Sequence, residues 1–247
     1  MRGLITDAVD LVLGRACLAC DAPGAGLCHP CLEGMRGQAG TVTLPVAGLA
    51  VTSAVRYDGL GRRMILDYKE HGHRALARPL GSLLADAVAE RVTPAGHDRP
   101  GRLLALVPIP RHRRAARGFD ALAAVARGAC RQLAADGWTS RVAPLLRADA
   151  DHEPLKRLGR DERFQRIEGA FRPASGVRRR PGELVIIVDD VMTSGATIGE
   201  AARLLDSAGM PADGAATVAM ATRALGDAAS RDRWGPTRGP ARSRRQA

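Results

Sequence analysis

A chain of 247 residues is long enough for one substantial domain and a small additional module, and its 45% hydrophobic content excludes general disorder. The net charge of +11 invites a nucleic-acid interpretation, but all but two of the 37 basic residues are arginines, which also fits a GC-rich codon bias. Aromatic residues make up only 3%, which is a poor supply for stacking on single-stranded bases. No run of about 18 apolar residues occurs, so no membrane span is expected.

The first residues do not resemble a secretory signal, because Asp7 and Asp10 interrupt a short apolar pattern. The cytoplasm is therefore the expected location. Residues 4–13 have apolar side chains at helical spacing and predict a short amphipathic helix. At the other end, residues 231–247 hold six arginines and one acid, and we expect a disordered basic tail. Weak binding of single-stranded DNA through this tail is an open alternative.

Between these ends the predicted elements alternate. Residues 50–57 predict a strand, residues 59–72 a helix or turn, and residues 75–92 a helix. Next come a strand over 103–110, a helix over 119–135, a strand over 141–147, a charged mobile loop over 148–167, a strand over 183–188, a helix over 197–208 and a strand over 214–222. This alternation favours an α/β fold with a mainly parallel sheet covered by helices on both faces.

Four cysteines form two Cys-x₂-Cys pairs near the amino terminus, Cys17 with Cys20 and Cys28 with Cys31. Two such pairs can close a tetrahedral thiolate site, so we expect a small zinc-ribbon-like module holding structural Zn²⁺. Disulfides are the rival, disfavoured in a cytoplasmic chain, and an iron–sulfur cluster is a smaller alternative. Cys130 is left over and is expected to be a buried helix residue.

The most informative segment runs from Val185 to Thr197. A buried strand delivers the adjacent carboxylates Asp189 and Asp190 to its carboxyl end, where ligands of open α/β sheets bind. The hydroxyl- and glycine-rich loop that follows opens a helix, and such an amino terminus favours a phosphate. The segment thus offers acceptors for sugar hydroxyls beside an anion site. The alternative is that the aspartates merely cap the helix.

This segment resembles the phosphoribosyl-pyrophosphate motif of type I phosphoribosyltransferases, and the whole chain is similar to the ComF group within that superfamily. Other segments that match in order are the cysteine pairs, residues 56–72, residues 107–120 and residues 168–171. The resemblance implies a type I phosphoribosyltransferase fold and assigns Asp189 and Asp190 to the ribose hydroxyls as catalytic residues. It also implies that the 5-phosphate is bound by a loop made of Val191, Met192, Thr193, Ser194, Gly195, Ala196 and Thr197.

The resemblance also implies which basic residues bind the negatively charged pyrophosphate group. Pyrophosphate binding falls to Lys69, Arg111, Arg114 and Arg117, with Mg²⁺ held mainly by ligand oxygens and water. A flexible loop over residues 147–171, carrying Arg160 and Arg163, would close over the reaction centre and exclude water. The chain departs from the ComF pattern at Asp120, Leu155 and Arg166, which concerns the binding of the acceptor.

Three functions follow from these features. The first is transfer of a phosphoribosyl group from phosphoribosyl pyrophosphate to a nitrogen nucleophile. The second is a non-catalytic role in competence and DNA uptake, as a ligand sensor or docking partner of a competence helicase. A nucleobase salvage enzyme is less favoured, because such enzymes lack a four-cysteine module. The expected organisation is an amino-terminal helix and zinc knuckle over 1–40, a phosphoribosyltransferase domain over 41–228 and a basic tail over 229–247.

Overall fold

A six-stranded sheet forms the centre of the protein. The computed structural model describes residues 16–24, 26–43, 48–93, 103–110, 120–149 and 169–221. The strand order is β1-β2-β8-β7-β3-β4, in which β1 pairs antiparallel with β2 and the other five strands run parallel. Their bounds are β1 (Gly40–Thr43), β2 (Ala50–Arg56), β3 (Leu103–Pro108), β4 (Thr139–Val142), β7 (Leu184–Met192) and β8 (Gly214–Met220).

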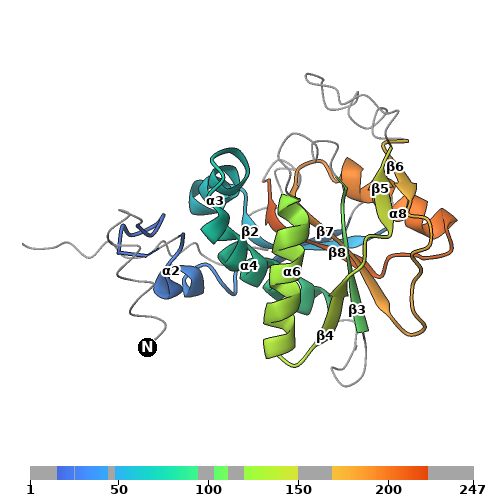
Figure 1. Cartoon of the computed structure of the whole chain (residues 1–247), viewed down its shortest axis with the longest axis horizontal. Helices are drawn as coiled ribbons and strands as arrows, with labels where there is room; N and C mark the ends of the chain where they lie inside the picture. Colours follow the sequence, from blue (N-terminus) through green and yellow to red (C-terminus); the bar gives the residue numbers. More distant parts are fainter. Residues whose placement is uncertain are drawn as a thin grey trace, which may run out of the picture.

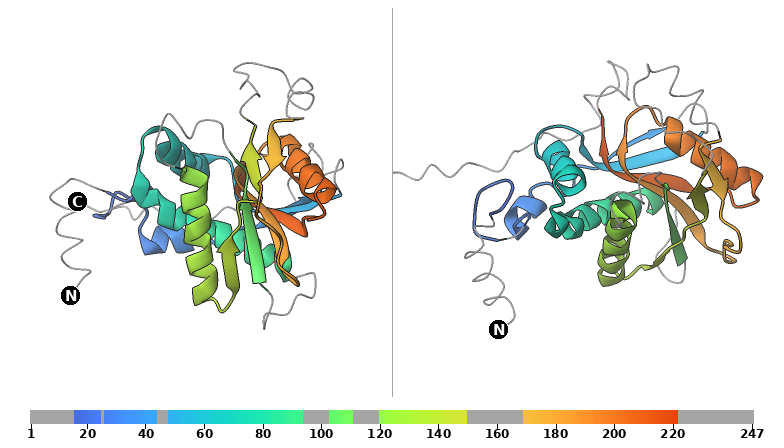
Figure 2. Two further views of the ribbon diagram at one scale, coloured as in Figure 1. Left: turned by 45° about the vertical axis from the view of Figure 1, so that its right-hand side comes forward. Right: turned by 45° about the horizontal axis from the view of Figure 1, so that its top comes forward.

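Helices cover both faces of this sheet. Helices α4 and α6 pack together on one face and α8 lies on the other (Figures 1 and 2). The described helical elements are α2 (His29–Glu33), α3 (Gly59–Glu70), the 3₁₀ turn η1 (Arg74–Leu76), α4 (Ala77–Val92), α6 (Ala121–Ala135) and α8 (Ala196–Ser207). The expected α/β architecture with a mainly parallel, helix-covered sheet is therefore confirmed.

The two hydrophobic cores follow from the alternation of side chains along each strand. In β7, Leu184 and Ile186 face α4 and α6, whereas Val185 and Ile187 face α8. All four side chains are buried, as expected for a central parallel strand covered on both sides. Near-continuous apolar runs in β3, β7 and β8 are the sequence signature of that position.

Helices α4 and α6 cross at a contact between two glycines. A Cβ atom added to Gly81 would lie 2.9 Å from backbone atoms of Gly128, so the helices approach too closely for any side chain at this point. The close approach lets the flanking apolar residues of both helices interlock over the sheet.

Most predicted elements are confirmed to within a few residues, but the strand over 141–147 is wrong. Its first part belongs to β4, which ends at Val142, and its last part belongs to a separate two-stranded antiparallel sheet. That sheet consists of β5 (Leu146–Ala148) and β6 (Phe171–Pro173). Pro144 lies between β4 and β5, and a proline has no N–H to donate to a neighbouring strand.

The short elements α2, β1 and β6 were not predicted from the sequence. The expected helix over 4–13 and the tail over 229–247 lie outside the described residues, as does nearly all of the charged loop over 148–167.

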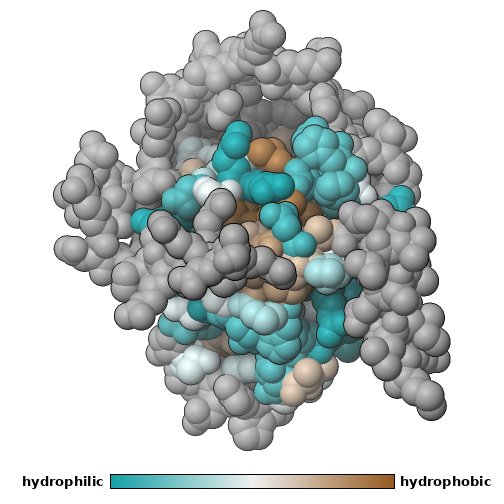
Figure 3. Space-filling view, turned by 90° about the vertical axis from the view of Figure 1, so that its left-hand side faces the viewer, coloured by the Kyte–Doolittle hydropathy of each residue, from teal (hydrophilic) through white to brown (hydrophobic). Residues whose placement is uncertain are grey.

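The cysteine knuckle (residues 16–24 and 26–38) lies at one end of the molecule, beside α3 and α4 (Figure 1). Leu18, Leu27 and Leu32 are partly exposed and pack against the core on the α4 side of the sheet. Figure 3 looks onto this end of the molecule, where described hydrophilic side chains surround a recess that contains hydrophobic ones. The knuckle is thus packed onto the α/β body.

Candidate functional site

The acidic pair lies within β7. Asp189 and Asp190 are 5% and 8% exposed, and the strand continues through Met192. The strand therefore extends beyond the predicted end at residue 188, and the carboxylates lie three and two residues before its last residue, Met192. The alternation of side chains between the two faces holds through Val188 but not to the end of the strand, where Val191 packs on the α4 side and Met192 on the α8 side.

Different groups hold the two carboxylates. The Nζ of Lys69 lies 2.6 Å from Oδ2 of Asp190, and the two side chains are 21% and 12% exposed. Oδ1 of Asp189 accepts a hydrogen bond from the backbone N–H of Asp190 at 2.8 Å. The structure thus brings together Lys69, Asp189 and Asp190, three residues that the sequence assigned to one site.

Lys69 reaches the sheet from the last turn of α3. The preceding residue, Tyr68, connects this end of α3 to α6. The hydroxyl of Tyr68 donates to the carbonyl of Ala121, the first residue of α6, at 3.0 Å. Tyr68 is 6% exposed, and burial raises the pKa of its hydroxyl to about 12. This hydroxyl therefore stays protonated at neutral pH and remains a donor.

The loop after β7 leads directly into α8. Gly195 is the residue before the first helical residue and has φ = 78°, a left-handed conformation that glycine adopts without strain. Gly195 offers no side-chain cap, and the first helical N–H, that of Ala196, donates to Oγ of Ser194 at 3.4 Å, so the alternative in which the aspartates serve as helix caps is wrong. The first turn of α8 presents backbone N–H groups and the positive end of the helix dipole beside Thr193 and Ser194.

The sheet order places this loop at a topological switch point. After β3 the chain passes through α6 to β4 on one side, and after β7 it passes through α8 to β8 on the other side. Since β3 and β7 are neighbours, the segments that follow them diverge to opposite faces. Ligands of open parallel sheets bind in the crevice that this divergence creates.

Five predicted site residues lie outside the described part of the chain: Arg111, Arg114, Arg117, Arg160 and Arg163. The elements on either side of them are described. Asp120 caps α6 by accepting from the N–H of Ala123 at 3.0 Å. Arg172 pairs with Asp149 at 2.5 Å, so the pairing of β5 with β6 holds together the two ends of the expected flexible loop.

Two buried hydroxyls beside Asp189 were missed in the sequence. Thr217 of β8 is in register with Asp189 on one side and with Ser53 of β2 on the other. The Ser53 and Thr217 hydroxyl oxygens lie 2.5 Å apart, and Thr217 also donates to the carbonyl of Ala219 at 3.0 Å. The available signal was a polar residue within a mainly apolar strand, Thr217 alone in β8 and Ser53 next to Thr52 in β2.

The four cysteine sulfurs converge in the knuckle, where all ligand atoms lie within 4.8 Å of one another. Sulfurs bound tetrahedrally at about 2.3 Å from a zinc ion are separated by about 3.8 Å. The Cys20 and Cys28 sulfurs are 3.7 Å apart, close to that value. All five cysteines of the chain are free thiols, so the expected grouping of Cys17, Cys20, Cys28 and Cys31 is confirmed as a cluster that could hold a metal ion.

The surroundings of the sulfurs lower the pKa of Cys17 and raise the pKa values of Cys28 and Cys31. Burial by itself would raise the pKa of Cys17, but N–H groups of Cys28 and Ala19 point at its sulfur and lower this pKa to about 6. Burial and the neighbouring sulfurs raise the pKa of Cys31. A cation at the centre would offset the repulsion among four thiolates. Cys130, the fifth cysteine, lies half-buried in α6.

A shallow surface depression lies away from both sites, next to the starts of β7 and β8. Its arginines serve the fold in part, because Arg179 donates to Asp213 and to the carbonyl of Glu183. The depression is lined by Arg178, Arg179, Arg180, Pro181, Gly182, Ala208, Gly209 and Met210. The depression therefore lies at the amino-terminal ends of the strands, whereas the acidic pair lies near the carboxyl end of β7.

In comparisons with known proteins, no family model matches this chain, and no curated protein matches its sequence. Among the described helices, none combines the length and the apolar character that crossing a membrane requires. The chemistry of the site is therefore inferred from its own residues and their positions in the fold.

Proposed function

We propose that this chain is a ComF-like protein of the type I phosphoribosyltransferase class that binds phosphoribosyl pyrophosphate together with Mg²⁺. The observation that carries the proposal is the position of Asp189 and Asp190 near the end of β7, with the left-handed Gly195 and the amino terminus of α8 following within six residues of Asp190. The topological switch between β3 and β7 also supports a binding site at the carboxyl ends of these strands.

Each part of the ligand has a matching group in this arrangement. The two ribose hydroxyls are donors, and the carboxylates of Asp189 and Asp190 are acceptors for them. The 5-phosphate fits the loop from Val191 to Thr197, where backbone amides and hydroxyls meet the positive end of the helix dipole. Pyrophosphate would be bound by Lys69 and by Arg111, Arg114 and Arg117, with Mg²⁺ neutralising part of its charge.

The reaction that this site supports is displacement at the anomeric carbon. A nitrogen nucleophile forms a bond to that carbon, the bond from the carbon to the pyrophosphate oxygen breaks, and pyrophosphate leaves with the electron pair. The nitrogen then loses its extra proton to solvent. Catalysis would consist of positioning and charge stabilisation, because no covalent intermediate is required.

The decisive experiment measures binding of phosphoribosyl pyrophosphate with Mg²⁺ by calorimetry. The double variant Asp189→Asn, Asp190→Asn should weaken binding at least about tenfold, because it removes charge-assisted hydrogen bonds worth roughly 1.5–3 kcal/mol each. Asp206→Asn is the matched control, since Asp206 is an exposed acid of α8 and its loss should leave affinity unchanged. Equal binding by the double variant and the parent would refute the site.

Release of pyrophosphate with ammonia or free nucleobases as acceptors tests the transfer step. Binding without release for any acceptor would favour the role of ligand sensor or docking partner in DNA uptake.

We further propose that the cysteine cluster holds structural Zn²⁺, because its four thiolates and their spacing fit tetrahedral coordination. Metal analysis of the purified protein distinguishes zinc from iron.

A further inference from the structure

The cysteine knuckle contacts the helix that carries Lys69. Nη1 of Arg63 in α3 donates to the carbonyl of Leu18 at 3.2 Å, and Leu18 lies inside the first Cys-x₂-Cys turn. Gly26, between the two cysteine pairs, packs on Ala75 of η1, where even an added Cβ would lie 3.2 Å from the Ala75 backbone. The knuckle therefore contacts α3 and the turn that follows it.

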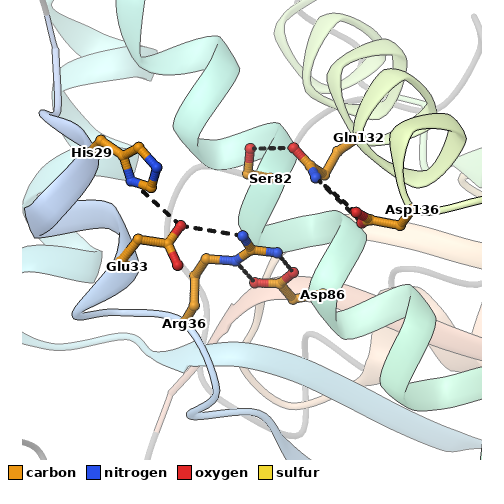
Figure 4. A network of polar contacts seen from close by, with 7 residues as sticks. All are labelled: His29, Glu33, Arg36, Ser82, Asp86, Gln132 and Asp136. Atoms are coloured by element: carbon orange, nitrogen blue, oxygen red, sulfur yellow. Dashed lines mark hydrogen bonds and ion pairs between the residues drawn. The ribbon is translucent and has the colours of Figure 1, made fainter.

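A charged pair fastens the other side of the knuckle to α4. Arg36 donates to both carboxylate oxygens of Asp86, with Nε at 2.8 Å and Nη2 at 2.5 Å (Figure 4). Glu33 accepts from the same guanidinium at 3.2 Å. A bidentate pair fixes orientation as well as distance. The knuckle is thus held on two sides, and α3 lies against it.

The same packing continues through the hydrophobic core. Leu32 of the knuckle and Met64, Ile65 and Tyr68 of α3 belong to one hydrophobic cluster. Lys69 follows Arg63 by six residues, which is about 9 Å along the axis of an α-helix. The knuckle contact and the Lys69–Asp190 ion pair therefore lie on one rigid element, less than two turns apart.

We propose that Lys69 is a positioning residue for Asp190 and that the cysteine knuckle fixes where Lys69 lies. This inference rests on the proposed function and adds a second role to the expected contact of Lys69 with pyrophosphate. Before ligand arrives, the ammonium group holds the Asp190 carboxylate in a fixed orientation, so that the carboxylate can accept from a ribose hydroxyl. The knuckle acts on the sugar site only through α3.

The physical reason is the close contact of two opposite charges at a site where Asp190 is 8% exposed. Because water screens such a pair only weakly, a change in their separation has a larger effect than at the surface. A hydrogen-bonded ion pair at 2.6 Å tolerates little movement, since a displacement of about 1 Å takes the atoms out of hydrogen-bond range. Loss of the metal would release the four sulfurs from one another, and the knuckle would lose the fixed shape with which Leu18 and Gly26 contact α3 and η1.

Ribose 5-phosphate separates the new role from the expected one, because it carries the sugar hydroxyls and the 5-phosphate but no pyrophosphate. Lys69→Met should weaken binding of ribose 5-phosphate about tenfold if Lys69 orients Asp190. Lys69→Arg keeps the charge and should restore part of the affinity. A residue that only contacts pyrophosphate would leave ribose 5-phosphate binding unchanged in Lys69→Met, which would overturn the positioning role.

Chemical labelling of amines tests the link to the knuckle without any sugar ligand. Lys69 and Lys156 are the only lysines in the sequence, so mass spectrometry resolves each of them. Asp190→Asn should increase the labelling rate of Lys69 several-fold. Removing the metal with a chelator should have the same effect, with the rate at Lys156 recorded as the internal reference.

Arg63→Ala breaks the contact to Leu18 while keeping all four cysteines, which guards against general unfolding. It should increase labelling of Lys69, whereas Arg62→Ala, an exposed neighbour on the same helix, should not. Unchanged Lys69 labelling after both metal removal and Arg63→Ala would refute the coupling.

Failure of the proposed function has a different result. If the metal-loaded parent binds neither phosphoribosyl pyrophosphate nor ribose 5-phosphate, the proposed function fails, and the labelling rates still decide whether the knuckle positions Lys69.

Discussion

Asp189 and Asp190 are adjacent in the chain but have different surroundings in the fold. Lys69 supplies a cation to Asp190, whereas Asp189 accepts from the backbone N–H of Asp190 and is in register with Thr217 of β8. The sequence placed both acids in one site, and the fold then gives them different partners. Single substitutions at the two positions should therefore differ in their effects.

Gly195 is the residue with a left-handed conformation in the loop between β7 and α8. Gly195→Ala should lower the free energy of unfolding by about 1–2 kcal/mol, because a side chain disfavours the left-handed conformation that Gly195 adopts. It should also weaken binding of phosphoribosyl pyrophosphate by displacing the loop. Denaturant unfolding and calorimetry measure the two effects.

Gly199→Ala is the matched control four residues further on. Gly199 lies inside α8, and an added Cβ would meet no atom within 4 Å. This substitution should stabilise the protein by up to about 1 kcal/mol, since alanine is the better helix former. Equal destabilisation by both changes would contradict the role assigned to the left-handed residue.

At the scale of elements, a buried ion pair fastens the start of β7 to β4. The Glu183 side chain is fully buried, and Arg141 of β4 donates to both of its carboxylate oxygens at 2.6 and 2.7 Å. Burial by itself would raise the pKa of Glu183, but the hydrogen bonds from Arg141 and from the N–H of Arg180 outweigh it and lower this pKa below the ordinary 4.5. The charged form is thus the one that the fold stabilises.

This direction of shift gives a pH dependence of stability. Because the pKa is lower in the folded state, the stabilisation is complete above about pH 4.5 and is lost as the pH falls through the folded value. Glu183→Gln should cost about 2–3 kcal/mol at pH 7, and the difference from the parent should shrink below about pH 4. Urea unfolding at several pH values measures this, with the exposed Glu33→Gln as a control that should change little. A difference that stays constant down to pH 3 would contradict the assignment.

The elements that were predicted and those that were missed differ in where their stability comes from. Long apolar runs predict buried strands such as β3 and β7, and apolar residues at helical spacing predict α4 and α6. The short strands β1, β5 and β6 have three or four residues each and form because a partner is brought to them by the fold. The break between β4 and β5 at Pro144 was readable from the sequence, since proline removes a strand donor.

At the scale of the whole molecule, the cysteine cluster should contribute to the stability of the assembled fold. Chelation of the metal should lower the melting temperature by at least about 5 °C, because the binding free energy of a structural metal is part of the folding free energy. Cys20→Ser should have a similar effect and should lower the metal content. Cys130→Ala is the control, since Cys130 lies in α6 outside the cluster, and it should leave the metal content unchanged. A melting temperature independent of the metal would contradict a structural role.

The sequence by itself determined the α/β class, the four-cysteine grouping and the positions of the candidate acids, because these depend on local periodicity and on residue spacing. Only the tertiary structure decided that Lys69 meets Asp190 and that the knuckle lies against α3. These contacts join residues far apart in the chain, and their geometry depends on the order of strands and the packing of helices. No local pattern encodes them, since an ion pair between α3 and β7 exists only after the sheet has brought both elements together.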